Sequence, residues 1–306
     1  MNVAWVDTDP RKPSCARAAV QQTATMDLIA SFADQALRTE LMLTPKPGLV
    51  DQRNCGAHCD MDLGTFLASA EAMALWWSHF VKIGCACPDI PVGDFLGWVR
   101  PAGVGCEKVM LEATGGVNTH KGAIFALGLF CSAAGRLLAR NIDLNRERLC
   151  SEVAWICAGL VDRELRGMQA TISAGECSFR RYGMTGARGE AASGYAVVRA
   201  VALPVYDRLQ RDGVSGTVAL LQVLLHIMAV NGDTNLVSRG GLAGLNFVRE
   251  HSGKLLREGG VLAPDGLRKI EAFDAELIRR HLSPGGSADL LAVTWFLSRF
   301  PTSQGA

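Results

Sequence analysis

Apolar side chains recur along this chain at steps of three and four residues, the spacing that places them on one face of an α-helix. In the segment 63–81, one stripe contains Leu63, Phe66, Leu67, Ala70, Met73, Ala74, Trp77 and Phe80. The same spacing predicts further helices over residues 28–41, 121–140, 146–165, 191–209, 217–230, 266–281 and 287–300. Alternation with a period of two residues is almost absent. The sequence therefore predicts an all-α fold, a single compact bundle of about ten helices.

The composition agrees with a large buried interior. Of the 306 residues, 49% are hydrophobic and 20% are charged, as in a globular protein with one continuous core. Residues 1–25 carry several charges and two prolines, so we expect a flexible tail there and a single all-helical domain over residues 26–306. A net charge of +1 gives no general attraction to nucleic acid, so any phosphate must be bound locally.

The cysteines and the longest apolar stretch predict where the protein resides. The ten cysteines lie in a chain too long to need a disulfide scaffold, and its start lacks a secretory signal, so we expect reduced thiols and a cytoplasmic protein. The longest uncharged apolar stretch, between Lys121 and Arg136, is shorter than the roughly 20 residues that cross a bilayer. We therefore predict a buried core helix there and no membrane partner.

Polar residues gather in the short joints between the apolar helices. The first joint, residues 44–62, holds three aspartates and His58. Magnesium prefers oxygen ligands, which makes Asp60 and Asp62 candidate ligands, although Asp62 could equally cap the following helix. A zinc site is the alternative, but it would need irregularly spaced residues without the paired spacing of zinc fingers: Cys55, His58, Cys59, Cys85 and Cys87.

The second joint, residues 115–122, opens into the most apolar helix of the chain. The start of a helix offers free N–H groups and the positive end of its dipole, and Lys121 adds a full charge. This joint is therefore a candidate anion site. The alternative is an ordinary cap by Asn118 or Thr119 beside a solvated lysine.

Two later joints combine charged side chains with glycine. In one, Arg188 can bind a phosphate through its guanidinium fork or pair with Glu190 at the surface. In the other, Asp233 lies in an Asn-Gly-Asp-Thr-Asn run that can be a simple turn. Because Arg239 and a glycine pair follow closely, Asp233 is also a candidate carboxylate beside a phosphate site.

In their order and their amino-acid sequences, these joints together resemble the triphosphoribosyl-dephospho-CoA synthases. The matching segments are 44–62, 116–122, 185–194, 231–241 and 283–291. The resemblance extends from about Leu28 to Phe300. The sequences of residues 54–58 and 228–235 are most similar to those of the enzymes that serve citrate lyase. The enzymes that serve malonate decarboxylase are the nearest alternative. Cys59 lies where a polar residue is commoner, and the tail before Ala24 has no clear counterpart.

The resemblance implies a transfer in which ATP is the ribosyl donor. The 2′-hydroxyl of 3′-dephospho-CoA would attack ribose C1 of ATP, adenine would leave, and the triphosphate would stay on the sugar. The product would pass to a holo-synthase that loads a carrier protein. Mg²⁺ is the expected cofactor, and an oligomer is compatible with this reading. An ATP-dependent phosphotransferase, which would release ADP, and a noncatalytic helical interaction protein are the alternatives.

For this reaction the resemblance also suggests roles for individual residues. Asp233, Glu190 and His58 are expected to be catalytic, with Asp233 or Glu190 as the base or as the stabiliser of a positively charged sugar. Asp60 and Asp62 are expected to bind Mg²⁺. The residues expected to bind substrate phosphates are Lys46, Asn118, His120, Lys121, Arg188, Asn235 and Arg239.

Overall fold

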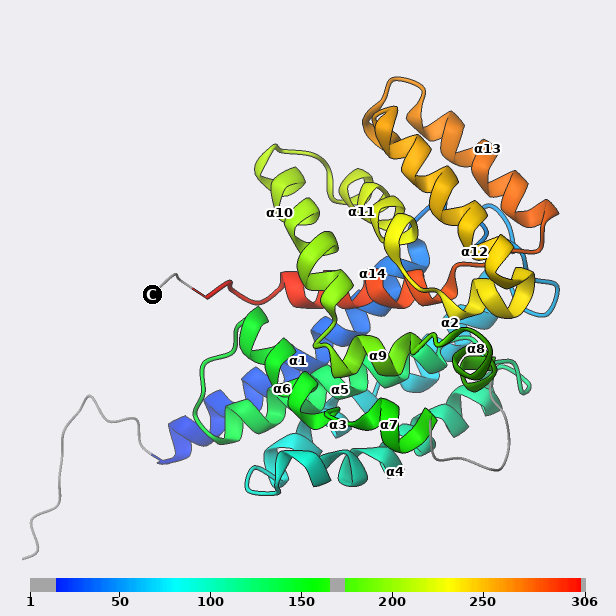
Figure 1. Ribbon diagram of the computed structural model, residues 1–306. Coiled ribbons are helices and arrows are strands. Elements are labelled where there is room, and N and C mark those ends of the chain that lie inside the picture. The colour runs from blue at the N-terminus through cyan, green and yellow to red at the C-terminus, as the bar shows by residue number, and fades with distance from the viewer. Residues whose placement is uncertain (1–14, 166–173, 304–306) are drawn as a thin grey trace, which may run out of the picture.

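The computed structural model describes residues 15–165 and 174–303. No strand occurs in these two ranges, and the predicted all-α fold is confirmed (Figure 1). The helices are α1 (Cys15–Met42), α2 (Leu63–Met73), α3 (Trp76–Ala86), α4 (Val92–Ala113), α5 (Lys121–Ala139), α6 (Arg146–Ile156), α7 (Leu160–Leu165), α8 (Ala174–Tyr182), α9 (Gly186–Ala192), η1 (Val198–Ala202, a π-helix), α10 (Leu203–Arg211), α11 (Gly216–Val230), α12 (Thr234–Arg257), η2 (Gly260–Leu262, a 3₁₀ helix), α13 (Gly266–Arg279) and α14 (Gly285–Ser298).

Three of the predicted helices are interrupted in the structure. The segment 63–81 forms α2 and α3, and the segment 146–165 forms α6 and α7 on either side of a turn at Gly159. The third, predicted over residues 191–209, begins in the last residues of α9, which ends at Ala192. The chain then turns through Gly194 and Tyr195, whose φ angles are 66° and 58°, before η1 begins. Apolar residues continue on both sides of each break, so their spacing alone does not reveal it.

Three helices, α4, α8 and α12, were not predicted. α4 contains Pro101 and several glycines, which disfavour a helix locally, but Phe95, Val99 and Met110 on one face are buried in the core. Tertiary packing therefore outweighs local propensity in α4. α1 also begins earlier than expected, at Cys15, within the segment predicted as a tail, of which residues 1–14 lie outside the described residues.

The most extensive contact between two helices of the described residues joins α3 and α5. Side chains on nearly every face of α5 are buried. α5 is long and apolar enough to span a membrane, but 78% of that stretch is buried inside the protein, as expected of a core helix. Gly84 of α3 and Gly135 of α5 let the two backbones approach closely, because a Cβ atom on either would overlap a carbonyl oxygen of the other helix.

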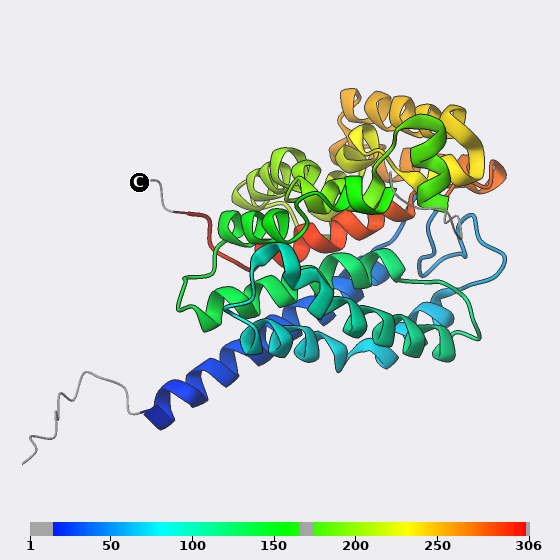
Figure 2. The ribbon, with the colours of Figure 1, turned by 60° about the horizontal axis from the view of Figure 1, so that its bottom comes forward.

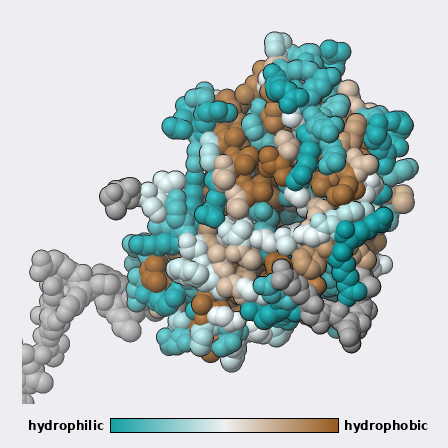
Figure 3. Space-filling model, viewed as in Figure 1, coloured by the Kyte–Doolittle hydropathy of each residue, from teal (hydrophilic) through white to brown (hydrophobic). Residues whose placement is uncertain are grey.

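α14 connects the two halves of the molecule. It crosses the middle of the bundle between the group formed by α10 to α13 and the group that contains α5, as Figures 1 and 2 both show. It contacts α1, α5 and α11. On the face seen in Figure 3, hydrophobic residues gather toward the middle and hydrophilic residues cover the outer edges. Because α14 lies between these two groups of helices, its start comes close to the starts of α5 and α12.

We predict that Gly135→Ala lowers the free energy of unfolding by about 1–3 kcal/mol, because the added methyl group must push α3 away from α5. Urea unfolding followed by circular dichroism measures the change. Gly97→Ala on α4 is the matched control, since nothing lies within 4 Å of the added Cβ atom. The control should be neutral or stabilising by up to ~1 kcal/mol. Equal losses in both variants would contradict close packing at Gly135.

Candidate active site

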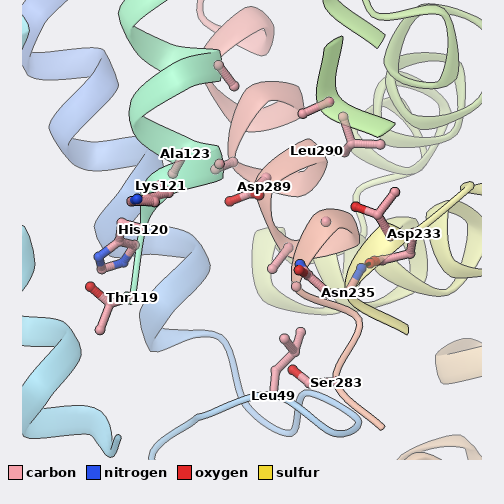
Figure 4. A pocket seen from close by; sticks show the side chains of 18 of the residues that line it. Leu49, Thr119, His120, Lys121, Ala123, Asp233, Asn235, Ser283, Asp289 and Leu290 are labelled. Atoms are coloured by element: carbon pink, nitrogen blue, oxygen red, sulfur yellow. Dashed lines mark hydrogen bonds between the residues drawn. The ribbon is translucent and has the colours of Figure 1, made fainter. Parts of the chain in front are cut away.

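The joints converge on a cavity of about 470 Å³ (Figure 4). Side chains from the loop after α1 and from the starts of α5, α12 and α14 line it, together with residues of α9. Ten of the twelve predicted site residues border the cavity: Lys46, His58, Asp60, Asn118, His120, Lys121, Glu190, Asp233, Asn235 and Arg239. The fold therefore brings residues from separate joints to one cavity, and the hydrogen bonds of each residue indicate what it can do there.

Buried carboxylates hold the loop that follows α1. Asp51 accepts hydrogen bonds from the backbone N–H of Lys46 at 2.9 Å and of Asn54 at 3.2 Å. Asp274 of α13 accepts from the N–H of Gly48 at 2.8 Å and from the side-chain amide of Asn54 at 2.9 Å. These contacts fix the loop across a long separation in sequence, so that its later residues reach the cavity.

Lys46 is buried and already has a counterion. Its ammonium group donates to a carboxylate oxygen of Glu40 at 2.6 Å and to the Glu40 backbone carbonyl at 2.9 Å. The side chains of Lys46 and Glu40 are only 2% and 8% exposed. A buried ion pair is stable only while both partners are present, so the charge of Lys46 is compensated without a substrate phosphate.

His58 and Arg239 form one unit at the cavity. An Arg239 Nη atom lies 3.1 Å from Nδ1 of His58 and can only donate, so Nδ1 accepts and His58 is neutral. Nε2 of His58 then carries the proton and donates to the hydroxyl oxygen of Ser283 at 2.9 Å. Burial and the charge of Arg239 lower the pKa of His58, whereas the exposed Asp60, 3.6 Å from Nδ1, opposes the shift. His58 therefore orients Arg239.

The start of α5 is capped by its own sequence. The N-cap residue is His120, whose side chain makes no cap hydrogen bond, and Asn118 accepts a hydrogen bond from the N–H of Lys121 at 3.2 Å. The Lys121 ammonium group lies 3.1 Å from a Glu107 carboxylate oxygen, so the lysine is paired and not simply solvated. Nδ1 of the buried His120 lies 2.7 Å from the Ser69 hydroxyl. Burial lowers the pKa of His120 to about 3, so its ring is neutral at neutral pH.

Asp233 caps two helices with one carboxylate. One oxygen accepts from the N–H of Asn235, in the first turn of α12, at 3.0 Å. The other accepts from the N–H and the hydroxyl of Ser287, in the first turn of α14, at 2.8 and 3.0 Å. Burial raises the pKa of Asp233, and these hydrogen bonds oppose the rise. The turn interpretation accounts for the contact with Asn235, but it misses the contacts by which the same side chain holds the start of α14.

Glu190 borders the cavity with one oxygen engaged. That oxygen accepts from the N–H of Val197 at 3.2 Å. Burial raises the pKa of Glu190, whereas the hydrogen bond and the charge of Arg199 oppose the shift. No hydrogen bond from another described residue reaches the second oxygen.

Two predicted site residues do not border the cavity. Asp62 caps α2, where its carboxylate accepts from the N–H and the hydroxyl of Thr65, both at 2.8 Å. This contact is the helix cap that the alternative interpretation of Asp62 predicted. Arg188 donates to Glu164 at 2.8 Å and lies 3.7 Å from Glu176, so its carboxylate partners differ from the Glu190 of the alternative interpretation.

Sequence reasoning gave no role to three further polar residues of the cavity: Glu40, Tyr195 and Asp289. Glu40 lies inside a predicted helix and has no motif around it. Asp289 follows a glycine pair in the segment 283–291, which carries part of the family resemblance. That resemblance was the signal that could have identified it.

Comparison with known proteins identifies the same family as the five joints. The CitG family model, described as ATP:dephospho-CoA triphosphoribosyl transferase, matches residues 26–306. A 2-(5''-triphosphoribosyl)-3'-dephosphocoenzyme-A synthase of Klebsiella pneumoniae is 55% identical over 274 residues, which cover 89% of this chain and 91% of the relative. The Escherichia fergusonii protein of that name is 52% identical, covering 90% and 92%.

A Salmonella typhimurium protein named as a probable synthase of this kind is 49% identical and covers 99% of both chains. No solved structure shows a significant match. The resemblance seen in the five joints is therefore confirmed over nearly the whole chain. This chain belongs to the ATP:dephospho-CoA triphosphoribosyl transferase family.

Proposed function

We propose that this chain transfers the triphosphoribosyl group of ATP to the 2′-hydroxyl of 3′-dephospho-CoA in the cavity described above, with release of adenine. The observation that carries the proposal is the meeting of basic and acidic side chains from distant joints at one cavity, in a chain of this family. The volume of about 470 Å³ lies within the range of small-molecule sites.

Arg239 is suited to hold the triphosphate. Its guanidinium group donates to the carbonyl oxygen of Ala57 at 2.9 Å and contacts His58, but no carboxylate of the described residues lies within ion-pair distance of it. Its charge is therefore available to a phosphate. Lys121 adds a second positive charge, which it shares with Glu107. Both cations would bind the donor without cleaving its phosphates.

The cavity fits Mg²⁺ that arrives together with the triphosphate. Among the described residues, no group of three His, Cys, Asp or Glu side chains could hold a metal ion by itself. Mg²⁺ commonly uses one or two carboxylates and completes its shell with phosphate oxygens and water. Asp60 is exposed at the cavity and would supply that carboxylate, and the ion would neutralise part of the triphosphate charge.

Two of the predicted catalytic residues have different tasks in this proposal. The hydrogen bonds of Asp233 commit it to the scaffold. Glu190, with one oxygen free, would stabilise the positive charge that develops on the ribose as adenine leaves.

We further propose that the product is the prosthetic-group precursor of citrate lyase, passed to a holo-synthase in the cytoplasm. The resemblance of residues 54–58 and 228–235 to the enzymes that serve citrate lyase supports that pathway over the malonate decarboxylase pathway. Loading of the purified carrier protein of each lyase, in a coupled assay with the matching holo-synthase, distinguishes the two pathways.

The first expected outcome is that the protein, mixed with ATP, Mg²⁺ and 3′-dephospho-CoA, yields equal amounts of adenine and of the triphosphoribosyl adduct. Liquid chromatography with mass spectrometry measures both products. Omission of 3′-dephospho-CoA should abolish the adduct. Release of ADP with a phosphorylated acceptor would instead establish the phosphotransferase alternative.

The two arginines that were expected to bind phosphate provide a matched pair. Arg239→Gln removes the uncompensated charge at the cavity, and we predict that the KM for ATP rises about 10- to 100-fold. Arg188→Gln breaks contacts to Glu164 and Glu176 outside the cavity, and its KM should stay within about threefold of the parent value. Similar KM values for the two variants would argue against Arg239 as a phosphate ligand.

Asp233→Asn should destabilise the protein by about 1–3 kcal/mol, because an amide has a single acceptor oxygen and its NH₂ group would face an N–H donor of α12 or α14. Urea unfolding gives the free energy. Asp62→Asn, which alters an exposed cap of one helix, should cost less than about 1 kcal/mol. Equal stability of the parent and Asp233→Asn would contradict the double cap.

A further inference from the structure

Asp289 is a carboxylate of the cavity that has no partner among the described residues. It lies on the first turns of α14, and Figure 4 shows it turned toward the start of α5. No hydrogen bond or ion pair joins it to any residue that the structure describes. Gly122 leaves room for it, because a Cβ atom at that position would overlap the carboxylate. Asp233, close by, accepts three hydrogen bonds.

The surroundings of Asp289 disfavour its charge. It is half-buried at the wall of the cavity. Burial raises its pKa well above the usual range, with a further contribution from the negative charges of Glu40 and Asp233. The positive dipole end of α5 offsets only part of this cost. A carboxylate kept in such a place without a hydrogen-bond donor lowers stability, so a role in binding or chemistry is the natural reason for its presence.

Tyr195 gives a second and independent indication that this part of the cavity is built for a ligand. Its side chain is 1% exposed, its hydroxyl group is buried without a hydrogen-bond partner among the described residues, and it borders the same cavity. Its φ angle of 58° is unusual for a bulky residue. Strained residues with unpaired polar groups cluster at functional sites.

We propose that Asp289 is a catalytic residue that accepts the proton of the attacking hydroxyl group, an inference that rests on the proposed function. The hydroxyl oxygen of 3′-dephospho-CoA forms a bond to ribose C1 of ATP, while the bond between C1 and the glycosidic nitrogen of adenine breaks. The electron pair of that bond leaves with adenine, and the hydroxyl proton passes to Asp289. Adenine takes up a proton from water, and Asp289 afterwards releases its proton to water. A base needs a free lone pair directed into the cavity, and Asp289 has both oxygens free.

The two other acidic candidates fit this step less well. Asp233 would have to give up a helix cap to receive a proton, and Glu190 uses one oxygen on Val197. Asp289 receives the proton with no loss of an existing contact. Protonation would also remove the repulsion from Glu40 and Asp233, which favours the transfer.

The test compares stability with turnover in the full-length chain. Asp289→Asn removes the charge with little change in shape, so we expect adenine release to slow by about 10²- to 10⁴-fold. The urea midpoint should be equal to that of the parent or higher, because the variant loses an unpartnered charge. Asp265→Asn, at an ion pair with Lys269 outside the cavity, should leave the rate unchanged.

A second variant separates chemistry from a structural role. Asp289→Ala leaves space for formate, and added formate should raise the rate of this variant while leaving the parent and Asp289→Asn unaffected. Turnover of Asp289→Asn within about threefold of the parent would overturn the proposal, as would a slow Asp289→Ala variant that formate does not rescue. If the parent itself released no adenine, the proposed function would fail; an active parent with an equally active variant would remove only the assignment of Asp289.

Discussion

The arrangement of the cavity depends on the carboxylate of Asp233. A buried carboxylate needs hydrogen-bond donors, and the start of a helix has N–H groups that need acceptors. Asp233 meets both needs at once by capping α12 and α14. Asn231 extends the junction by donating to the Ser287 hydroxyl at 3.1 Å. Since α12 carries Arg239 and α14 carries Asp289, one carboxylate sets the relative position of the cation and the free carboxylate.

The cavity separates carboxylates that stabilise the protein from those that are free to act. Asp51 and Asp274 hold the loop after α1, and Glu40 neutralises Lys46. Asp289 has no such partner among the described residues, and burial raises its pKa. A structural carboxylate here accepts hydrogen bonds from the protein on its oxygens, whereas a catalytic candidate has oxygens that accept none. This difference distinguishes the two better than whether the residue is Asp or Glu.

The positive groups of the site follow the same logic. Lys46 and Lys121 each have a carboxylate partner, whereas Arg239 is held by carbonyl oxygens and by a neutral histidine ring. Neutral partners orient a guanidinium group without cancelling its charge. Among these three cations, Arg239 is therefore the one whose charge no carboxylate of the described residues compensates, although the sequence offered no reason to rank it above the lysines.

The sequence by itself determined the helical class, the family and the joints that form the cavity, because helical spacing and cap chemistry are local properties. It could not determine that α4 survives Pro101, since burial of its apolar face decides this. Nor could it separate Asp62, which caps one helix, from Asp233, which joins two. The contacts that settle these roles, such as Asp233 with Ser287 and Asp289 against Gly122, connect residues far apart in the chain. Only the tertiary structure brings such residues together, and the number of hydrogen bonds that each carboxylate then receives follows from that packing.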